Sequence, residues 1–117
     1  YYPLLLDAVN RGELTLDRVV SMVATSPAES FGLGGVKGAI QVGADADLVV
    51  ANMDSPWTIT NEGALSRIGW TCYDGRQIST SVERTYVRGI EVFADGAVTG
   101  APGTGKLALS STDREGK

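Results

Sequence analysis

Asp45 and Asp47 form the pair of acidic residues whose spacing could serve chemistry. In an extended segment, residues two apart point to the same face, so both carboxylates could reach one cation. Such a pair more often closes a turn, because its oxygens accept hydrogen bonds from nearby backbone N–H groups. We therefore expect Asp45 and Asp47 to shape a turn, and we assign neither as a metal ligand.

The chain contains no histidine and a single cysteine, Cys72. Without histidine, neither a Ser-His-Asp or Cys-His catalytic arrangement nor a histidine metal site can be built. A thiol without a base is a poor nucleophile, so we interpret Cys72 as a small hydrophobic side chain. A lone cysteine cannot form an internal disulfide, which suits a reducing, cytoplasmic setting. The sequence thus predicts no catalytic, cofactor-binding or metal-ligating residue in this chain.

The segment Gly100–Lys106, which reads Gly-Ala-Pro-Gly-Thr-Gly-Lys, has the glycine and lysine spacing of a phosphate-binding loop. Such a loop also needs a Ser or Thr after the lysine and a helix that points its N-terminus at the phosphates. Here Leu107 follows, and the remaining residues are too few and too polar for a packed helix. We therefore interpret the segment as a glycine-rich exit from the last hairpin.

Composition indicates a globular protein, since 43% of the 117 residues are hydrophobic and 21% are charged. The formal net charge of -4 and the lack of Lys- or Arg-rich runs argue against nucleic-acid binding. No apolar run approaches the roughly 18 residues that a membrane helix needs. The chain lacks an initiator Met and opens on Tyr1, so we expect it to be a piece of a longer protein.

Helical signals fill the first third of the chain. A short helix is expected over residues 3–11, with a proline in its first turn and a glycine after its end. Thr15 is predicted to cap a second helix that ends near Thr25, because the residue before a proline is pushed away from helical geometry. Ser26 is predicted to cap a third helix, which Gly32 ends.

Alternating patterns and turn signals dominate the rest, so the chain is predicted to be α+β. Asp95-Gly96 is a strong hairpin signal, and one helical turn over 61–67 precedes a loop that Trp70 and Tyr73 could pin to a core. The expected extended segments are 39–42 (a strand or a link), 47–52, 57–60, 81–88, 90–93 and 97–99. The expected core residues are Leu5, Leu16, Val20, Val23, Phe31, Leu48, Val50, Val87 and Phe93.

The segment 37–49 resembles the signature Lys-Gly-x-Ile-x-x-Gly-x-Asp-Ala-Asp-Leu-Val that follows the catalytic barrel in the amidohydrolase superfamily, and it matches every specified position. Its flanks resemble the cyclic amidohydrolases, the dihydroorotases, hydantoinases and allantoinases. The matching flanks are Pro3–Asp7, Gly12–Leu16, Ser26–Ala28, Phe31–Leu33, Tyr73–Gly75 and Thr85–Gly89. Thr71, Cys72 and Thr80 depart from that group, because Ser, Pro and Gly are usual there.

The resemblance implies a parent enzyme with one or two zinc ions at the mouth of a (β/α)8 barrel, where metal-activated hydroxide attacks a ring amide carbonyl. The family's metal ligands and general base precede the matched part, and neither Lys37 nor Lys106 matches the metal-bridging lysine. Residues 1–35 would then be the last helices of the TIM-type barrel, 36–106 part of a small β-sandwich, and 107–117 a flexible tail. The segment itself would be structural.

The resemblance also implies the partners: the rest of the parent chain, which supplies the barrel and further sandwich strands, a small cyclic amide or ureide, and further copies in a homo-oligomer. Two other interpretations stay open. The parent could be another amidohydrolase, a deaminase or an N-acyl-amino-acid hydrolase. Alternatively, the chain could be a free-standing, non-catalytic binding domain.

Overall fold

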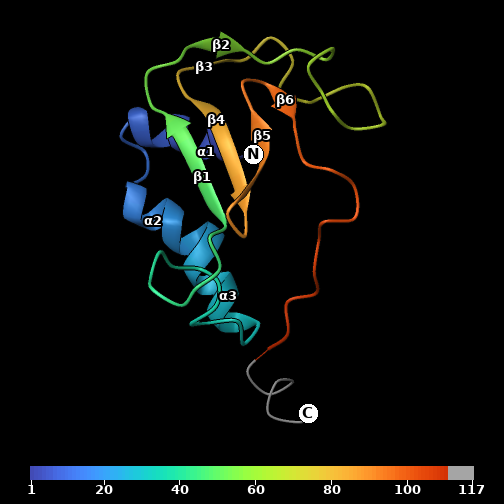
Figure 1. Cartoon of the computed structure of the whole chain (residues 1–117). Coiled ribbons are helices and arrows are strands. Elements are labelled where there is room, and N and C mark those ends of the chain that lie inside the picture. Colours follow the sequence, from blue (N-terminus) through green and yellow to red (C-terminus); the bar gives the residue numbers. More distant parts are fainter. Residues whose placement is uncertain (111–117) are drawn as a thin grey trace.

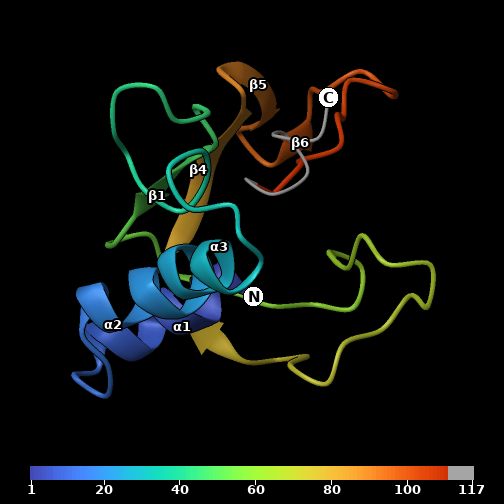
Figure 2. The same cartoon turned by 90° about the horizontal axis from the view of Figure 1, so that it is seen from below.

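The computed structural model describes residues 1–110. Its first part is helical, and Figures 1 and 2 both place the helices on one side of the main sheet. Helix α1 spans Tyr2–Asn10, with a proline in its first turn as the sequence predicts. Helix α2 spans Leu16–Val20, and the Thr15 side chain caps it by accepting a 3.2 Å hydrogen bond from the backbone N–H of Arg18. The predicted Thr15 cap is thereby confirmed.

The predicted helix break before Pro27 is wrong. Helix α2 continues into a π-helical turn, η1 (Ser21–Thr25), and then into α3 (Ser26–Ser30). Ser26 keeps helical dihedrals (φ -62°, ψ -41°), and its N–H bonds to the carbonyl of Ser21, five residues back. Because proline has no N–H and crowds the preceding turn, the wider turn lets the helix pass Pro27 without a break. Ser26 therefore does not cap a new helix.

The main sheet is antiparallel, with strand order β1-β4-β5-β6 (Figure 1). Its strands are β1 (Leu48–Asn52), β4 (Ser81–Val87), β5 (Ile90–Ala94) and β6 (Ala97–Val98). A separate pair, β2 (Trp57–Thr58) with β3 (Gln77–Ile78), lies between β1 and β4 in the sequence. Both hairpin turns, Arg88-Gly89 and Asp95-Gly96, have positive φ at both residues, as a type I′ turn requires. The predicted Asp95-Gly96 turn is thereby confirmed.

The long loop between β2 and β3 projects away from the helices and the sheet (Figures 1 and 2). It forms turns but no helix over residues 61–67, so the expected helical turn is wrong. Trp70 and Tyr73 are exposed and do not pin the loop to a core, because the loop bends back on its own backbone. Residues 39–42 form no strand, so the expected strand is wrong; they link the helices to β1 through a bend at residue 39 and a turn that starts at residue 42.

The buried side chains gather where α1 meets β3 and the start of β4. They are Leu6, Asp7, Ala8, Ile78 and Thr80, with Val19 and Ala28 buried along the helical run. Of the expected core residues, four are largely exposed: Leu16 (51%), Val20 (46%), Phe31 (74%) and Val50 (42%). The others are half-buried: Leu5, Val23, Leu48, Val87 and Phe93.

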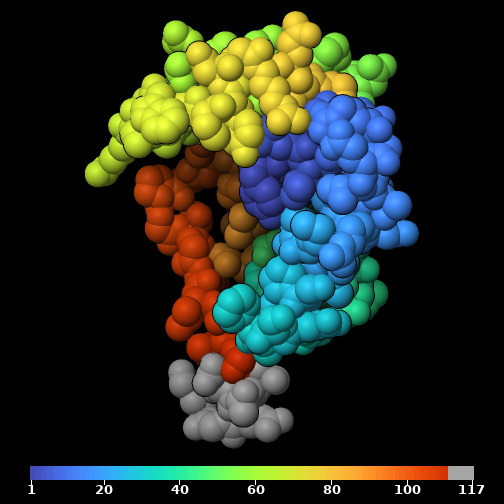
Figure 3. All heavy atoms as spheres, turned by 180° about the vertical axis from the view of Figure 1, so that it is seen from behind, coloured from blue at the N-terminus to red at the C-terminus, as the bar shows by residue number. Residues whose placement is uncertain are grey.

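The expectation of a core position was wrong for Leu16, Val20, Phe31 and Val50. The apolar pattern of the sequence marks a wide apolar face, and only part of that face packs against another element. Helix α1 packs with the side that carries Leu6, not Leu5, and α2 packs with Val19, not Val20. After β6 the chain runs beside the molecule, and Figure 3 shows a hollow between it and the helices. The expected frayed tail lies almost wholly in 111–117, outside the described residues.

Candidate functional site

The acidic pair singled out in the sequence lies around Lys37. The Lys37 Nζ atom is 2.8 Å from Asp45 Oδ2 and also pairs with Asp47 Oδ2. The second carboxylate oxygen of Asp47 accepts a 2.8 Å hydrogen bond from the backbone N–H of Arg88, in the β4–β5 turn. The expected closing of a local turn is wrong: the backbone N–H that Asp47 binds lies 41 residues away, and the Asp45 carboxylate meets a side-chain ammonium instead of a nearby backbone N–H.

The Lys37–Asp47 ion pair is held in its charged form by hydrogen bonds. Burial alone would lower the pKa of Lys37, but its hydrogen bonds to Asp45 and Asp47 raise that pKa above its usual value. Burial would raise the pKa of Asp47, but the bonds from Lys37 and from the Arg88 N–H hold it below its usual range. Both oxygens of the Asp47 carboxylate are therefore already engaged by protein donors.

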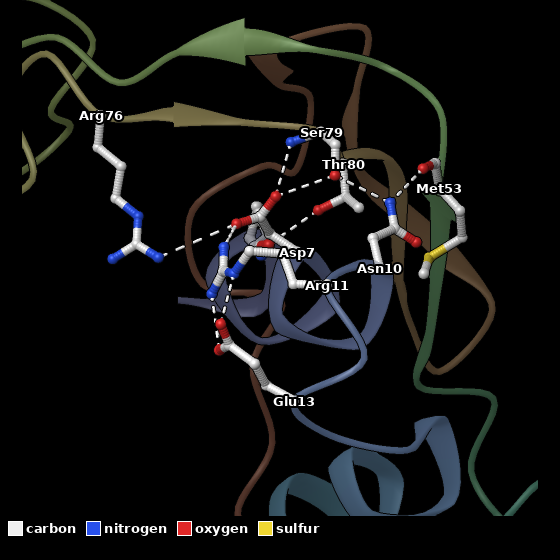
Figure 4. A network of polar contacts seen from close by, with 9 residues as sticks. Asp7, Asn10, Arg11, Glu13, Met53, Arg76, Ser79 and Thr80 are labelled. Carbon is white, nitrogen blue, oxygen red and sulfur yellow. Dashed lines mark hydrogen bonds and ion pairs between the residues drawn. The ribbon is translucent and has the colours of Figure 1, made fainter.

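A second polar cluster, which the sequence interpretation missed, surrounds Asp7 on α1 (Figure 4). The residue Asp7 is only 4% exposed, although its side chain is a carboxylate. The backbone N–H and the hydroxyl of Ser79 both donate to Asp7 Oδ1 at 2.9 Å. Arg11 pairs with Oδ2, Arg76 approaches it to 4.0 Å, and Glu13 holds Arg11 from the other side at 2.8 Å.

Hydrogen bonding decides the charge state of Asp7. The bond from the Ser79 backbone lowers its pKa and, with the Ser79 hydroxyl and the two arginines, outweighs the opposing effect of burial. Glu13 likewise has a lowered pKa, chiefly because Arg11 donates to it. The buried Asp7 carboxylate joins α1 to the segment after β3, and without the Ser79 donors it would lie poorly paired away from water.

One signal in the sequence could have pointed to Asp7. It is the single charged residue in the otherwise apolar run from Leu4 to Val9, in a helix expected to be buried. Charged residues are rarely buried unless they are paired, so an acidic residue in such a run indicates a specific partner. The identity of that partner was not predictable, because Ser79 lies 72 residues further along the chain.

An apolar groove of about 640 Å³ opens between the helical run and β1. Its walls include Leu16, Val20 and Phe31, three of the residues wrongly expected in the core, with Val49 on the strand side. Other lining residues are Tyr2, Leu6, Val19, Val23, Ala24, Pro27, Ala28, Leu33, Gly38, Ala39, Ile40, Leu48, Ala51 and Met53, and the polar residues are Lys37, Asp45 and Asp47. Most of the side chains that line the groove are apolar, as on a surface that packs against another element, and few of them are chemically reactive.

The remaining candidates are dispersed. Cys72 is an exposed free thiol in the β2–β3 loop, so its interpretation as a small, buried or half-buried hydrophobic side chain is wrong. Gly100–Lys106 has no helix after it within residues 107–110, and the carbonyl of Thr104 accepts a hydrogen bond from the Arg88 guanidinium. That arrangement agrees with a glycine-rich exit and lacks the helix N-terminus that a phosphate site needs.

Over residues 1–110, no cluster of three or more His, Cys, Asp or Glu side chains could hold a metal ion. The closest carboxylates, Asp45 and Asp47, are engaged by Lys37 and by Arg88. No helix in the same range is long and apolar enough to cross a membrane.

Comparison with known proteins places these elements among hydrolases. The sequence profile of the amidohydrolase family matches residues 8–93. The chain is 37% identical over 100 residues to a dihydroorotase of Pyrococcus furiosus, covering 86% of this chain and 24% of that protein. It is 31% identical over 99 residues to a D-hydantoinase of Rhizobium radiobacter (85% and 22%) and 34% over 87 residues to an allantoinase of Bacillus licheniformis (74% and 19%).

Solved structures agree with the sequence matches. A D-hydantoinase structure superposes with a TM-score of 0.81 at 30% identity, covering 88% of this chain and 23% of its own. The dihydropyrimidinase of Brevibacillus agri superposes with a TM-score of 0.83 at 29% identity, covering 88% and 23%. The chain therefore spans about a quarter of the length of these two proteins.

Proposed function

The chain belongs to the amidohydrolase family, and from this we propose that it is the C-terminal part of a metal-dependent enzyme that hydrolyses a carbon–nitrogen bond in a cyclic amide or ureide. The observation that carries the proposal is the similarity to dihydroorotase, hydantoinase and allantoinase over 74% or more of this chain. On this proposal the reaction opens a ring, whereas a deaminase would release ammonia and an N-acyl-amino-acid hydrolase would cleave an open-chain amide.

Within that enzyme the chain is structural. Residues 1–35 supply the last helices of the (β/α)8 barrel, and residues 36–106 supply part of a small β-sandwich that braces it. Superposition on hydantoinase chains over 88% of this chain supports that division. The groove between the helical run and β1 then receives the remainder of the enzyme, which would cover Leu16, Val20 and Phe31.

The shape of the chain supports a role as one part of a larger body. Its radius of gyration is 16.1 Å. A compact domain of this length would have a radius of gyration of about 13 Å. Large apolar side chains such as Phe31 (74% exposed) and Ile40 (91% exposed) lie on its surface. An open shape and exposed apolar side chains are expected where a partner surface completes the core.

Enzymes of the amidohydrolase family depend on a metal, and we propose zinc. The residues described here do not fit the metal, since the chain has no histidine and its nearest carboxylates are engaged by Lys37. We therefore assign the metal ligands and the catalytic base to the rest of the enzyme. The proposal also includes a cytoplasmic location, in line with the single unpaired Cys72, and a homo-oligomeric parent.

The test compares the full-length protein that contains this chain with the 117-residue chain alone. Both are assayed for hydrolysis of dihydroorotate, hydantoin and allantoin, before and after metal chelation and after zinc is restored. We expect turnover by the full-length protein that chelation abolishes and zinc restores, and no turnover by the chain alone.

Two results would contradict the proposal. One is turnover by the 117-residue chain itself, free of contaminating enzyme. The other is a metal-loaded full-length protein that opens no cyclic amide. Ammonia release distinguishes the nearest rival, because ring opening of a cyclic amide retains its nitrogen in the product and deamination does not.

A further inference from the structure

The helices are joined to the strands mainly through α1. This helix packs against β3 and β4, whereas α2 and α3 pack chiefly on the π-helical turn between them. On their other side, α2 and α3 face β1 across the apolar groove. The position of the helical run relative to the sheet thus depends on two links, the small contact area of α1 and the contact of Gly38 with the run.

Polar contacts from one face of α1, here called the stripe, make up part of this contact area. Pro3, Asp7 and Asn10 follow one another at spacings of four and three, so they share a face of α1. The Pro3 carbonyl accepts a 2.8 Å hydrogen bond from the Thr80 hydroxyl, and the Asp7 carboxylate accepts two bonds from Ser79.

At the C-terminal end of the stripe, the Asn10 amide donates to the Met53 carbonyl at 2.7 Å and to the Ser79 hydroxyl at 2.9 Å. Asp7 is the only charged member of the stripe. It lies in its middle, where Figure 4 shows the bonds from both directions converging.

The groups around the Asp7 carboxylate favour its ionised form, because they are hydrogen-bond donors and cations. Its carboxylate faces Arg11 on its own helix, Arg76 ahead of β3, and Ser79 on the β3–β4 connection. Glu13, behind Arg11, is the other titratable group on this side. A protonated carboxyl would bring an O–H donor among donors and would leave Arg11 paired with Glu13 alone.

We propose that Asp7 is an acid-released clamp. Its carboxylate holds α1 on the β3–β4 connection, and its protonation frees the helical run from that connection while β1, β4 and β5 keep their pairing. The β1–β4 and β4–β5 ladders consist of backbone hydrogen bonds, which acid does not remove. The proposal stands on the contacts of this chain and does not depend on the proposed function.

The pH window follows from the sign of the shift. The pKa of Asp7 is lowered from its ordinary 3.8, first by the Ser79 backbone bond. A group whose pKa is lower in the folded state stabilises fully above its unfolded value, and that contribution is lost as the pH falls through the folded value. The clamp is therefore closed at neutral pH and opens below 3.8.

The first experiment follows the unmodified chain by ¹⁵N NMR from pH 7 down to pH 2.5. The Ser79 amide resonance should titrate with a midpoint below 3.8, and its contact with the Asp7 β-protons should disappear. Corrected for intrinsic rates, amide exchange at Ser79 should then accelerate at least roughly tenfold more than exchange in β4. Simultaneous loss of all protected amides, or a Ser79 resonance unchanged to pH 2.5, would overturn the clamp.

A pair of matched variants separates Asp7 from other carboxylates. Asp7→Asn keeps an oxygen acceptor but not the charge, so Ser79 should exchange rapidly already at pH 7 and should not titrate. Asp47→Asn makes the same change at the Lys37 cluster and should leave the Ser79 titration as in the unmodified chain. Wild-type protection of Ser79 in Asp7→Asn would refute the proposal. If Asp7→Asn does not fold, the titration of the unmodified chain decides.

Discussion

Gly38 brings the segment between the helices and β1 into direct backbone contact with the helical run. Its φ is +86°, and a Cβ placed there would lie 2.6 Å from the Ala28 Cβ and 2.9 Å from the Ala24 carbonyl oxygen. Its own carbonyl accepts a 3.1 Å bond from the Thr25 hydroxyl. This glycine of the family signature therefore has a packing role that other residue types cannot fill.

Replacement of Gly38 by alanine should lower the free energy of unfolding by roughly 3 kcal/mol, from left-handed backbone strain plus a clash with Ala28 and Ala24. Gly43→Ala is the matched control. Its φ is +91°, but nothing lies within 4 Å of its added Cβ, so only the strain of about 1 kcal/mol applies. Urea titration of both variants measures the difference, and equal losses would contradict the packing role.

For single residues, whether a contact can be predicted from the sequence depends on how far along the chain its partner residue lies. The bond from the Arg88 N–H to Asp47 was not predictable, because Arg88 lies 41 residues further along the chain. The Asp7 clamp was not predictable, because its donors arrive 72 residues later. The Lys37 pairing was also missed, since nothing in the sequence shows that the chain between Lys37 and Asp45 folds back on itself.

Among the elements, α2 starts at a capped residue, and the run that follows is continuous from Leu16 to Ser30. Thr15→Ala removes the acceptor for the Arg18 N–H and should cost about 1 kcal/mol of unfolding free energy. Thr15→Ser keeps the acceptor and should cost much less. Thermal unfolding followed by circular dichroism compares the two, and an equal loss would show that the cap is not what matters.

The helix start at Thr15 and the turn at Asp95-Gly96 were predictable because both act through bonds to residues two or three positions away. The continuous helix across Pro27 was not, because it depends on a π-helical turn that the sequence does not mark. The exposure of Leu16, Val20, Phe31 and Val50 was missed for another reason. Periodicity shows which residues are apolar, and it does not show which of them another element reaches.

For the whole molecule, the groove and its apolar walls should determine how the isolated chain behaves. We expect it to bind a hydrophobic dye such as ANS at neutral pH, since residues such as Phe31 are exposed around the groove. Phe31→Gln should weaken dye binding while it changes the free energy of unfolding by less than about 0.5 kcal/mol, as for most exposed sites.

Leu107→Gln is the control, because Leu107 is 86% exposed but does not line the groove. Dye binding should be unchanged in this variant. A chain that stays monomeric and binds no dye would favour the interpretation as a free-standing domain. Equal effects of the two variants would show that the dye does not bind at the groove.

The distance of 72 residues between Asp7 and Ser79 also sets a delay during synthesis. At translation rates of roughly 5–20 residues per second, α1 leaves the ribosome about 4–14 s before the residue that it binds. A helix of nine residues is marginal on its own in water, so until then the α1 segment has its apolar face uncovered and only Arg11 to pair with Asp7. Until Ser79 emerges, the helical run is the part of the nascent chain on which a chaperone would act.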